Sequence, residues 1–234
     1  MASETIGPLR VTTIGRGDGP SPSILLCHGF GAPGDDLVPL AREIDAGPGV
    51  RWFFPEAPLE LAWGGNAWWE IDIERMQFMA LRGQRSPLAE ETPPGLAEAR
   101  KALEATIAEL ERSHGVRREA LIIGGFSQGA MLTTEIALHA EVPFAGLVAL
   151  SGNLLSEDRW AAAARQRGAS LHVLQSHGKS DQLLPFEGAE ALRDLLVSSG
   201  ASVDFLAHGG GHEIPYPVLQ ALGAFAGKRL GGRG

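Results

Sequence analysis

The stretch Gly125-Phe126-Ser127-Gln128-Gly129 indicates the fold, because it joins two segments with different hydrophobic patterns. The apolar run 120–124 before it is typical of a buried strand. The segment 130–139 after it combines good helix formers with apolar spacing, which predicts a helix packed on a sheet. A serine at such a strand-to-helix turn can be held in a strained conformation with its oxygen above the sheet. The alternative is a glycine-rich turn whose serine only hydrogen-bonds the backbone.

Length and composition favour one soluble domain. The chain has 234 residues, of which 44% are hydrophobic, so it can bury one sizeable core and we expect a single domain over 1–234. A net charge of −8 and a pI of about 5.4, without clustered Lys and Arg, argue against nucleic-acid binding. The first seven residues lack the features of a secretory signal, and no apolar run is long enough for an integral membrane segment. We therefore expect a cytoplasmic protein.

Strands and helices alternate along the chain. Strands are predicted at 9–14, 23–27, 50–55, 120–124, 144–150, 171–175 and 202–206. Helices are predicted at 35–44, 95–114, 130–139, 157–167, 187–198 and 216–230. This order predicts an α/β fold with a mostly parallel central sheet and helices on both faces, in which 9–14 is an outer strand and 23–27 an interior one. Ligands bind such sheets at the carboxyl ends of the strands.

The pattern breaks down between about residues 56 and 92. Aromatic and apolar side chains occur there among Gly, Asn and charged residues without a sustained period: Trp63, Trp68, Trp69, Met76, Phe78 and Met79. A long segment of this kind in a compact domain is usually functional, although its aromatics can also fill the core. We expect an irregular, Trp-rich insertion that shapes a pocket.

A serine nucleophile needs a base, and the base needs an orienting acid. In a sheet of this type the three follow the order serine, acid, histidine, each in a loop after a strand. Asp181 follows the 171–175 strand and His212 follows the 202–206 strand, so both should lie at the edge of the sheet where Ser127 lies. Three weaker acid candidates fall at a helix start, within a helix and within a strand: Asp158, Asp194 and Asp204.

His208 is the rival for the base, since it lies in the same predicted loop as His212. The two could also be interpreted as a metal pair. Three glycines between them disfavour the helix that would place both on one face, and no third ligand is obvious, so we expect no metal. His208 is expected to be a local hydrogen-bonding residue. Cys27, the single cysteine, lies in an apolar strand and is expected to be a core residue rather than a nucleophile.

Acyl transfer also requires hydrogen-bond donors for the oxyanion. One is expected from the backbone N–H of Gln128, which follows the serine, and the other from the glycine-rich loop after an early strand. In His28-Gly29-Phe30-Gly31 the Phe30 N–H is our candidate for the second donor. The alternative for this loop is a plain glycine-rich strand exit.

Four motifs in this order resemble the phospholipase/carboxylesterase family of α/β-hydrolases, which includes small bacterial carboxylesterases and acyl-protein thioesterases. They are Leu26-Cys27-His28-Gly29-Phe30-Gly31, Gly125-Phe126-Ser127-Gln128-Gly129, His177-Gly178-Lys179-Ser180-Asp181 with Leu184-Pro185, and Gly211-His212. The resemblance covers nearly the whole chain and implies an α/β-hydrolase fold. It also implies Ser127 as nucleophile, His212 as base and then acid, Asp181 as orienting carboxylate, and the Phe30 and Gln128 amides as oxyanion hole.

The resemblance also bears on the substrate. The stretch Trp68-Trp69-Glu70-Ile71-Asp72 resembles the aromatic-acidic segment that the family places beside its acyl pocket, although the second aromatic is Trp and Glu follows it. Four residues are candidates for lining the substrate pocket: Trp63, Trp69, Met131 and Leu184.

The resulting prediction is a serine hydrolase that cleaves small-molecule carboxylic esters of short to medium acyl chains without a cofactor. An acyl thioesterase or lysophospholipase with the same residues is the alternative, because the leaving group is not encoded in the triad. A non-catalytic ligand-binding protein on a hydrolase scaffold is a third hypothesis. The oligomeric state stays open, with a homodimer among the options.

Overall fold

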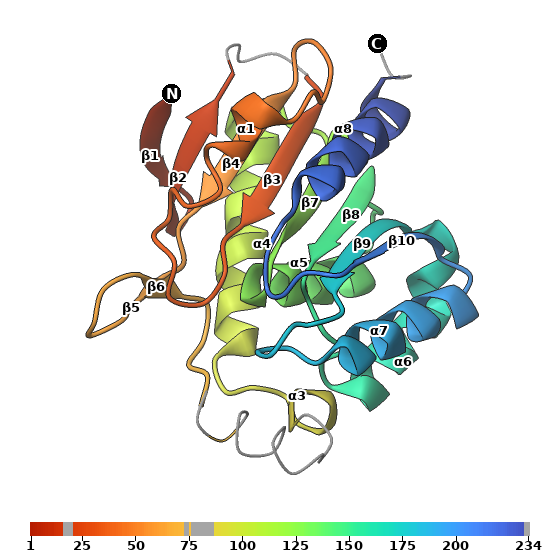
Figure 1. The fold of residues 1–234 in the computed structure, drawn as a ribbon. Helices are drawn as coiled ribbons and strands as arrows, with labels where there is room; N and C mark the ends of the chain where they lie inside the picture. The colour runs from red at the N-terminus through yellow and green to blue at the C-terminus, as the bar shows by residue number, and fades with distance from the viewer. Residues whose placement is uncertain (16–20, 73–74, 76–86, 232–234) are drawn as a thin grey trace.

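The computed structural model describes residues 1–15, 21–72, 75 and 87–231 (Figure 1). Its centre is an eight-stranded sheet with the order β1-β2-β4-β3-β7-β8-β9-β10. The strands are β1 (Ala2–Ile6), β2 (Leu9–Ile14), β3 (Ser23–Cys27), β4 (Arg51–Pro55), β7 (Leu121–Phe126), β8 (Gly146–Leu150), β9 (His172–Gly178) and β10 (Ser202–His208). The pairs β1–β2 and β2–β4 are antiparallel, and all other pairs of this sheet are parallel. The prediction of a mostly parallel sheet is confirmed.

Helices cover both faces of the sheet. The described helices are α1 (Leu40–Glu43), α3 (Pro87–Glu90), α4 (Leu96–Ser113), α5 (Gln128–His139), α6 (Glu157–Arg167), α7 (Phe186–Ser198) and α8 (Tyr216–Leu230). Alternate residues of β3 enter two separate cores, because successive side chains of a strand point to opposite faces. Leu25 packs with residues of α4, α5, α6 and α7, whereas Ile24 packs with residues of α8. Among the described helices, none combines the length and apolar character needed to cross a bilayer.

The N-terminal edge of the sheet differs from the prediction. The segment 9–14 forms β2 as expected, but it is not the outermost strand, because β1 pairs with it and forms the edge. Four of the five residues of β1 are exposed, and only Ile6 is buried. A strand with so little buried surface has almost no hydrophobic pattern, which is why the sequence did not predict it.

The first helix is also shorter than predicted. Instead of a helix over 35–44, turns precede the four-residue α1. Within these turns, the amides of Asp36, Val38 and Leu40 bond to carbonyls three residues earlier. Pro39 has no N–H to donate and disfavours a helical conformation at Val38, so a regular helix cannot begin before it.

The segment 56–92 is only partly described. It contains the short antiparallel pair β5 (Leu59–Glu60) and β6 (Asn66–Ala67), followed by the buried Trp68 and Trp69. Three residues that we expected in the irregular insertion lie outside the described residues: Met76, Phe78 and Met79. The described part of the segment resumes at α3. After this helix, Thr92 Oγ1 lies 2.9 Å from Oγ of Ser156, the residue before α6, and the two hydroxyls form a hydrogen bond.

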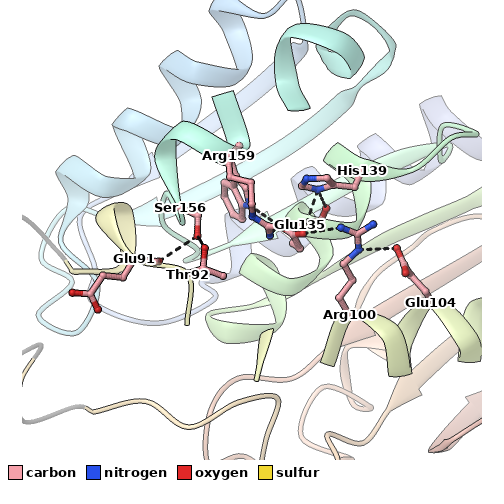
Figure 2. Close-up of polar contacts among 9 residues, drawn as sticks. Glu91, Thr92, Arg100, Glu104, Glu135, His139, Ser156 and Arg159 are labelled. Atoms are coloured by element: carbon pink, nitrogen blue, oxygen red, sulfur yellow. Dashed lines mark hydrogen bonds and ion pairs between the residues drawn. The ribbon is translucent and has the colours of Figure 1, made fainter. Parts of the chain in front are cut away.

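A buried carboxylate ties α5, the helix that follows Ser127, to its neighbours (Figure 2). The Glu135 side chain is 1% exposed and accepts hydrogen bonds from Arg100 of α4 at 3.1 Å and from the Trp160 indole of α6 at 2.7 Å. Arg159 of α6 forms an ion pair with it, and His139 Nδ1 lies 3.3 Å away. A buried charge is costly unless it is paired in this way. The cluster therefore favours one fixed position of α5 between α4 and α6.

Candidate functional site

Ser127 lies at the turn between β7 and α5, as the sequence predicted. Its φ of 55° and ψ of −117° are rare for a residue with a side chain, and such strain occurs mostly at functional sites. The conformation is held on both sides: Ser127 N donates to Leu150 O of β8 at 2.8 Å, and Ser127 O accepts from Met131 N of α5 at 3.1 Å. These bonds therefore fix the Ser127 backbone between the end of β7 and the start of α5.

Asp181 and His212 come together because the loops after β9 and β10 are joined. Lys179 N donates to His208 O at 2.8 Å, and Ser180 N donates to Gly210 O at 3.0 Å. The loops approach so closely at Gly178 that a Cβ there would lie 2.1 Å from Gly211 O, so only glycine fits. Beyond this contact, His212 Nδ1 lies 2.7 Å from Asp181 Oδ2.

The Asp181 carboxylate is buried and accepts several hydrogen bonds. Besides the contact to His212, its Oδ1 accepts from the amides of Leu183 and Leu184, both at 2.9 Å. Burial alone would raise the pKa of Asp181, but the hydrogen bonds from His212 and the two amides, with the charge of His212, lower it below its ordinary value. Asp181 therefore stays ionised near neutral pH, and its Oδ2 keeps the proton of His212 on Nδ1.

The other candidates from the sequence lie elsewhere. Asp158 is in the first turn of α6, Asp194 pairs with Arg193 on α7, and Asp204 lies within β10. His208 is the last residue of β10 rather than a loop residue, and its Nδ1 accepts a bond from Gly210 N at 3.3 Å. Cys27 is completely buried, and burial raises the pKa of its thiol well above the ordinary value.

The loop after β3 is held by the buried His28. Its Nδ1 lies 2.8 Å from Gly29 O, which can only accept, and its Nε2 accepts from Ala57 N at 3.0 Å. The ring is therefore neutral with its proton on Nδ1, in agreement with a pKa that burial lowers below the ordinary value. Trp68 Nε1 also donates to His28 O at 3.0 Å. These contacts fix the backbone immediately before Phe30, a role of His28 that the sequence did not indicate.

Gln128 contributes its side chain as well as its backbone. Its Oε1 accepts from Trp68 N at 2.9 Å, and its Nε2 donates to Trp69 O at 2.8 Å. The predicted oxyanion donors, the backbone amides of Phe30 and Gln128, donate no hydrogen bond to another described residue. The sequence indicated only the Gln128 backbone, because a side-chain contact across 60 positions depends on the fold.

A cavity of about 180 Å³ lies between these groups. Ser127 and His212 line it together with Phe30, and the His212 ring packs on Phe126 with centroids 4.7 Å apart. The remaining walls are mostly apolar, apart from Asp36: Gly29, Ala32, Asp36, Ile71, Phe126, Met131, Leu183 and Leu184. Met131 and Leu184, two of the four residues predicted for a substrate pocket, are thus in this wall.

The two tryptophans predicted for the pocket lie outside the lining of this cavity. Trp63 is 74% exposed and its ring centroid lies 6.5 Å from that of Phe30. Trp69 is fully buried and lines a neighbouring cavity of about 420 Å³, whose wall also contains Ile71. Ile71 therefore separates the two cavities.

Comparisons with known proteins agree with this architecture. The family model described as phospholipase/carboxylesterase matches residues 12–229. Acyl-protein thioesterase 1 homolog 1 of Dictyostelium discoideum is 26% identical over 219 residues, which cover 90% of this chain and 91% of that protein. Carboxylesterase SOBER1 of Arabidopsis thaliana is 27% identical over 217 residues, covering 89% and 91%. The crystal structure of esterase PE8 matches with a TM-score of 0.80 and 26% identity, covering 95% of this chain and 99% of that one. The chain therefore belongs to the phospholipase/carboxylesterase family and is a hydrolase with the α/β-hydrolase fold.

Proposed function

We propose that this hydrolase cleaves carboxylic esters of short to medium acyl chains through an acyl-serine intermediate on Ser127. The observation that carries the proposal is the hydrogen bond between His212 and Asp181 beside a cavity that His212 shares with the strained Ser127. A buried carboxylate, an imidazole and a serine hydroxyl in this arrangement are the parts of nucleophilic acyl transfer.

In the first half-reaction, His212 Nε2 takes the proton of Ser127 Oγ while Oγ attacks the ester carbonyl. Asp181 supports this step because its bond at 2.7 Å keeps the other imidazole proton on Nδ1, which leaves Nε2 free to accept. The imidazolium then gives its proton to the leaving alcohol, and the C–O bond breaks to leave the acyl-serine. Water attacks this acyl group with the same base, which restores Ser127 and releases the acid.

Negative charge develops on the carbonyl oxygen during the reaction, and we assign its stabilisation to the backbone amides of Phe30 and Gln128. Neither amide donates a hydrogen bond to another described residue. The backbone of each is held in place by a buried side chain of the site. His28 holds the loop of the first, and the Gln128 amide lies at the start of α5, where the helix dipole also favours an anion. Fixed donors of this kind lower the barrier without reorganising during the reaction.

We expect the acyl chain of the substrate to bind in the apolar cavity lined by Met131 and Leu184. We expect the highest kcat/KM on p-nitrophenyl butyrate or octanoate and a much lower value on the palmitate, because about 180 Å³ accommodates only a short or medium chain. The measurement is steady-state hydrolysis across a series of p-nitrophenyl esters. Absence of turnover on every ester would contradict the proposed chemistry, and a maximum at palmitate would contradict the chain length.

An acyl thioesterase is the second candidate, favoured by the similarity to an acyl-protein thioesterase. The same residues would form the same acyl-serine from either substrate, so only the leaving group differs. Phenyl butyrate and S-phenyl thiobutyrate, which carry the same acyl group, separate the two by their kcat/KM values, with a lysophospholipid as a third substrate. Our proposal expects the ester to be preferred, and a tenfold or larger preference for the thioester would favour the second candidate.

A further inference from the structure

A second histidine, His177, lies against the Asp181 carboxylate from within the sheet. It is the penultimate residue of β9 and is completely buried. Its Nε2 lies 2.8 Å from Leu184 O and 3.3 Å from Asp181 Oδ2, the oxygen that also contacts His212. The same Leu184 donates its N–H to Asp181 Oδ1 at 2.9 Å. His177, Leu184 and Asp181 therefore form a closed ring of contacts.

These contacts determine which protonation state His177 adopts. A carbonyl oxygen only accepts, so Nε2 must carry the proton that bonds to Leu184 O. The other nitrogen, Nδ1, is buried with no hydrogen-bond partner in the described residues. A second proton there would be a buried, unpaired donor, which is costly. The ring is therefore neutral.

The surroundings of the His177 ring both lower and raise its pKa. Burial lowers the pKa of His177 below its ordinary value, and positive charge on His212 or His208 lowers it further. The hydrogen bond to Leu184 and the charge of Asp181 oppose this shift but do not cancel it. A neutral His177 adds no positive charge beside Asp181, so the imidazolium that forms on His212 is the partner of that carboxylate.

We propose that His177 is a positioning residue, which holds the 181–184 turn through Leu184 and so keeps the Asp181 carboxylate directed at His212. This role rests on the proposed function, because it assigns to His177 an effect on the reaction through Asp181. Without the bond to Leu184 O, the end of the turn at Leu184 would lose its hydrogen bond to β9, although Asp181 N would still donate to Gly178 O at 3.2 Å. The carboxylate could then rotate away from the imidazole. The side chain of Leu184 lines the cavity and is also buried in the hydrophobic core. We therefore assign the backbone carbonyl of Leu184, rather than its side chain, to the contact with His177.

Two substitutions separate the hydrogen bond from the ring. In His177→Gln the amide nitrogen reaches as far along the side chain as Nε2 and can still donate to Leu184 O, whereas in His177→Asn it reaches only as far as Nδ1. We expect His177→Asn to lower kcat about 10- to 100-fold with KM changed less than about twofold, since misplacement of a catalytic group acts mainly on the transition state. His177→Gln should lower kcat by less than about threefold. His172→Asn, at the other end of β9, is the control.

The outcomes distinguish the proposal from its alternatives. Equal losses of kcat in the Gln and Asn variants, or an Asn variant as active as the wild type, would overturn it. If His177→Asn does not fold, a drop in kcat of more than about tenfold in a folded His177→Gln variant would also overturn it. Failure of the proposed function has a different signature, namely a wild-type protein that hydrolyses no ester at all, and this is seen before any His177 variant is compared.

The neutral state of His177 has its own readout in stability. Because the native pKa is below the ordinary value of 6.5, the unfolded chain binds this proton more readily than the native protein, and the stability from a neutral His177 is lost as pH falls below about 6.5. Relative to His177→Gln, which cannot titrate, the wild type should lose up to tenfold in its folding equilibrium constant per pH unit. Urea unfolding of both proteins at about pH 7.5, 6 and 5 measures this difference. A constant difference would contradict the neutral ring.

Discussion

Ser127→Ala lowers kcat/KM on p-nitrophenyl butyrate by about 10³-fold or more, while the protein remains folded. Removal of the hydroxyl removes the atom that forms the acyl intermediate, and neither the His212–Asp181 bond nor the oxyanion donors can replace it. Alanine fits the same strained turn about as well as serine, because the two side chains differ only by the hydroxyl. The measurement combines steady-state hydrolysis with thermal unfolding of both proteins.

The control is Ser199→Ala, which removes a hydroxyl bonded to Leu195 O just after α7 and outside the lining of the cavity. It should hydrolyse the ester at the wild-type rate. Retention of more than about a tenth of the wild-type kcat/KM in a folded Ser127→Ala protein would show that another group is the nucleophile.

The second large effect concerns the fold rather than the chemistry. Gly129→Ala is expected to destabilise the protein by about 3 kcal/mol or more, or to prevent folding. A Cβ at Gly129 would lie 2.1 Å from Cys27 O and 2.7 Å from His28 O. Both are backbone atoms of β3 and its loop, so the clash cannot be relieved by rotating a side chain. Helix α5 would have to move away from the strand that carries the Phe30 loop.

The matched control is Gly227→Ala on α8. This glycine is also helical, but a Cβ there would have no neighbour within 4 Å. We expect a small gain of about 0.5 to 1 kcal/mol, because alanine is the better helix former. Urea unfolding measures both changes. A Gly129→Ala protein within about 1 kcal/mol of the wild type would contradict the close approach of α5 to β3.

The sequence predicted the central architecture because its signals there are local and strong. The strands β7 and β8 are short apolar runs, and each strand from β7 to β10 is followed by a helix of at least eleven residues, so the sheet and the position of Ser127 could be inferred before the structure. The strand β1 and the shortened α1 were not predicted. Strand β1 buries almost no surface, so it has no hydrophobic pattern. In the segment before α1, Pro39 interrupts an otherwise periodic pattern.

The candidate site was predictable only as far as chain order allows. Asp181 and His212 could be placed after the correct strands, and the structure brings them within 2.7 Å. The supporting contacts could not be inferred, because each joins groups whose proximity depends on the tertiary fold. Gln128 reaches the backbone of Trp68, 60 positions earlier in the chain, and His177 had no signal beyond its place in a motif.

The most direct test of the central claim is covalent labelling with a fluorophosphonate, which reacts with activated serine hydroxyls. The account predicts one adduct per chain by intact-protein mass spectrometry, located on Ser127 by peptide mapping and absent from Ser127→Ala. An unlabelled wild-type protein, or an adduct on a different residue, would contradict the assignment of Ser127 as the nucleophile.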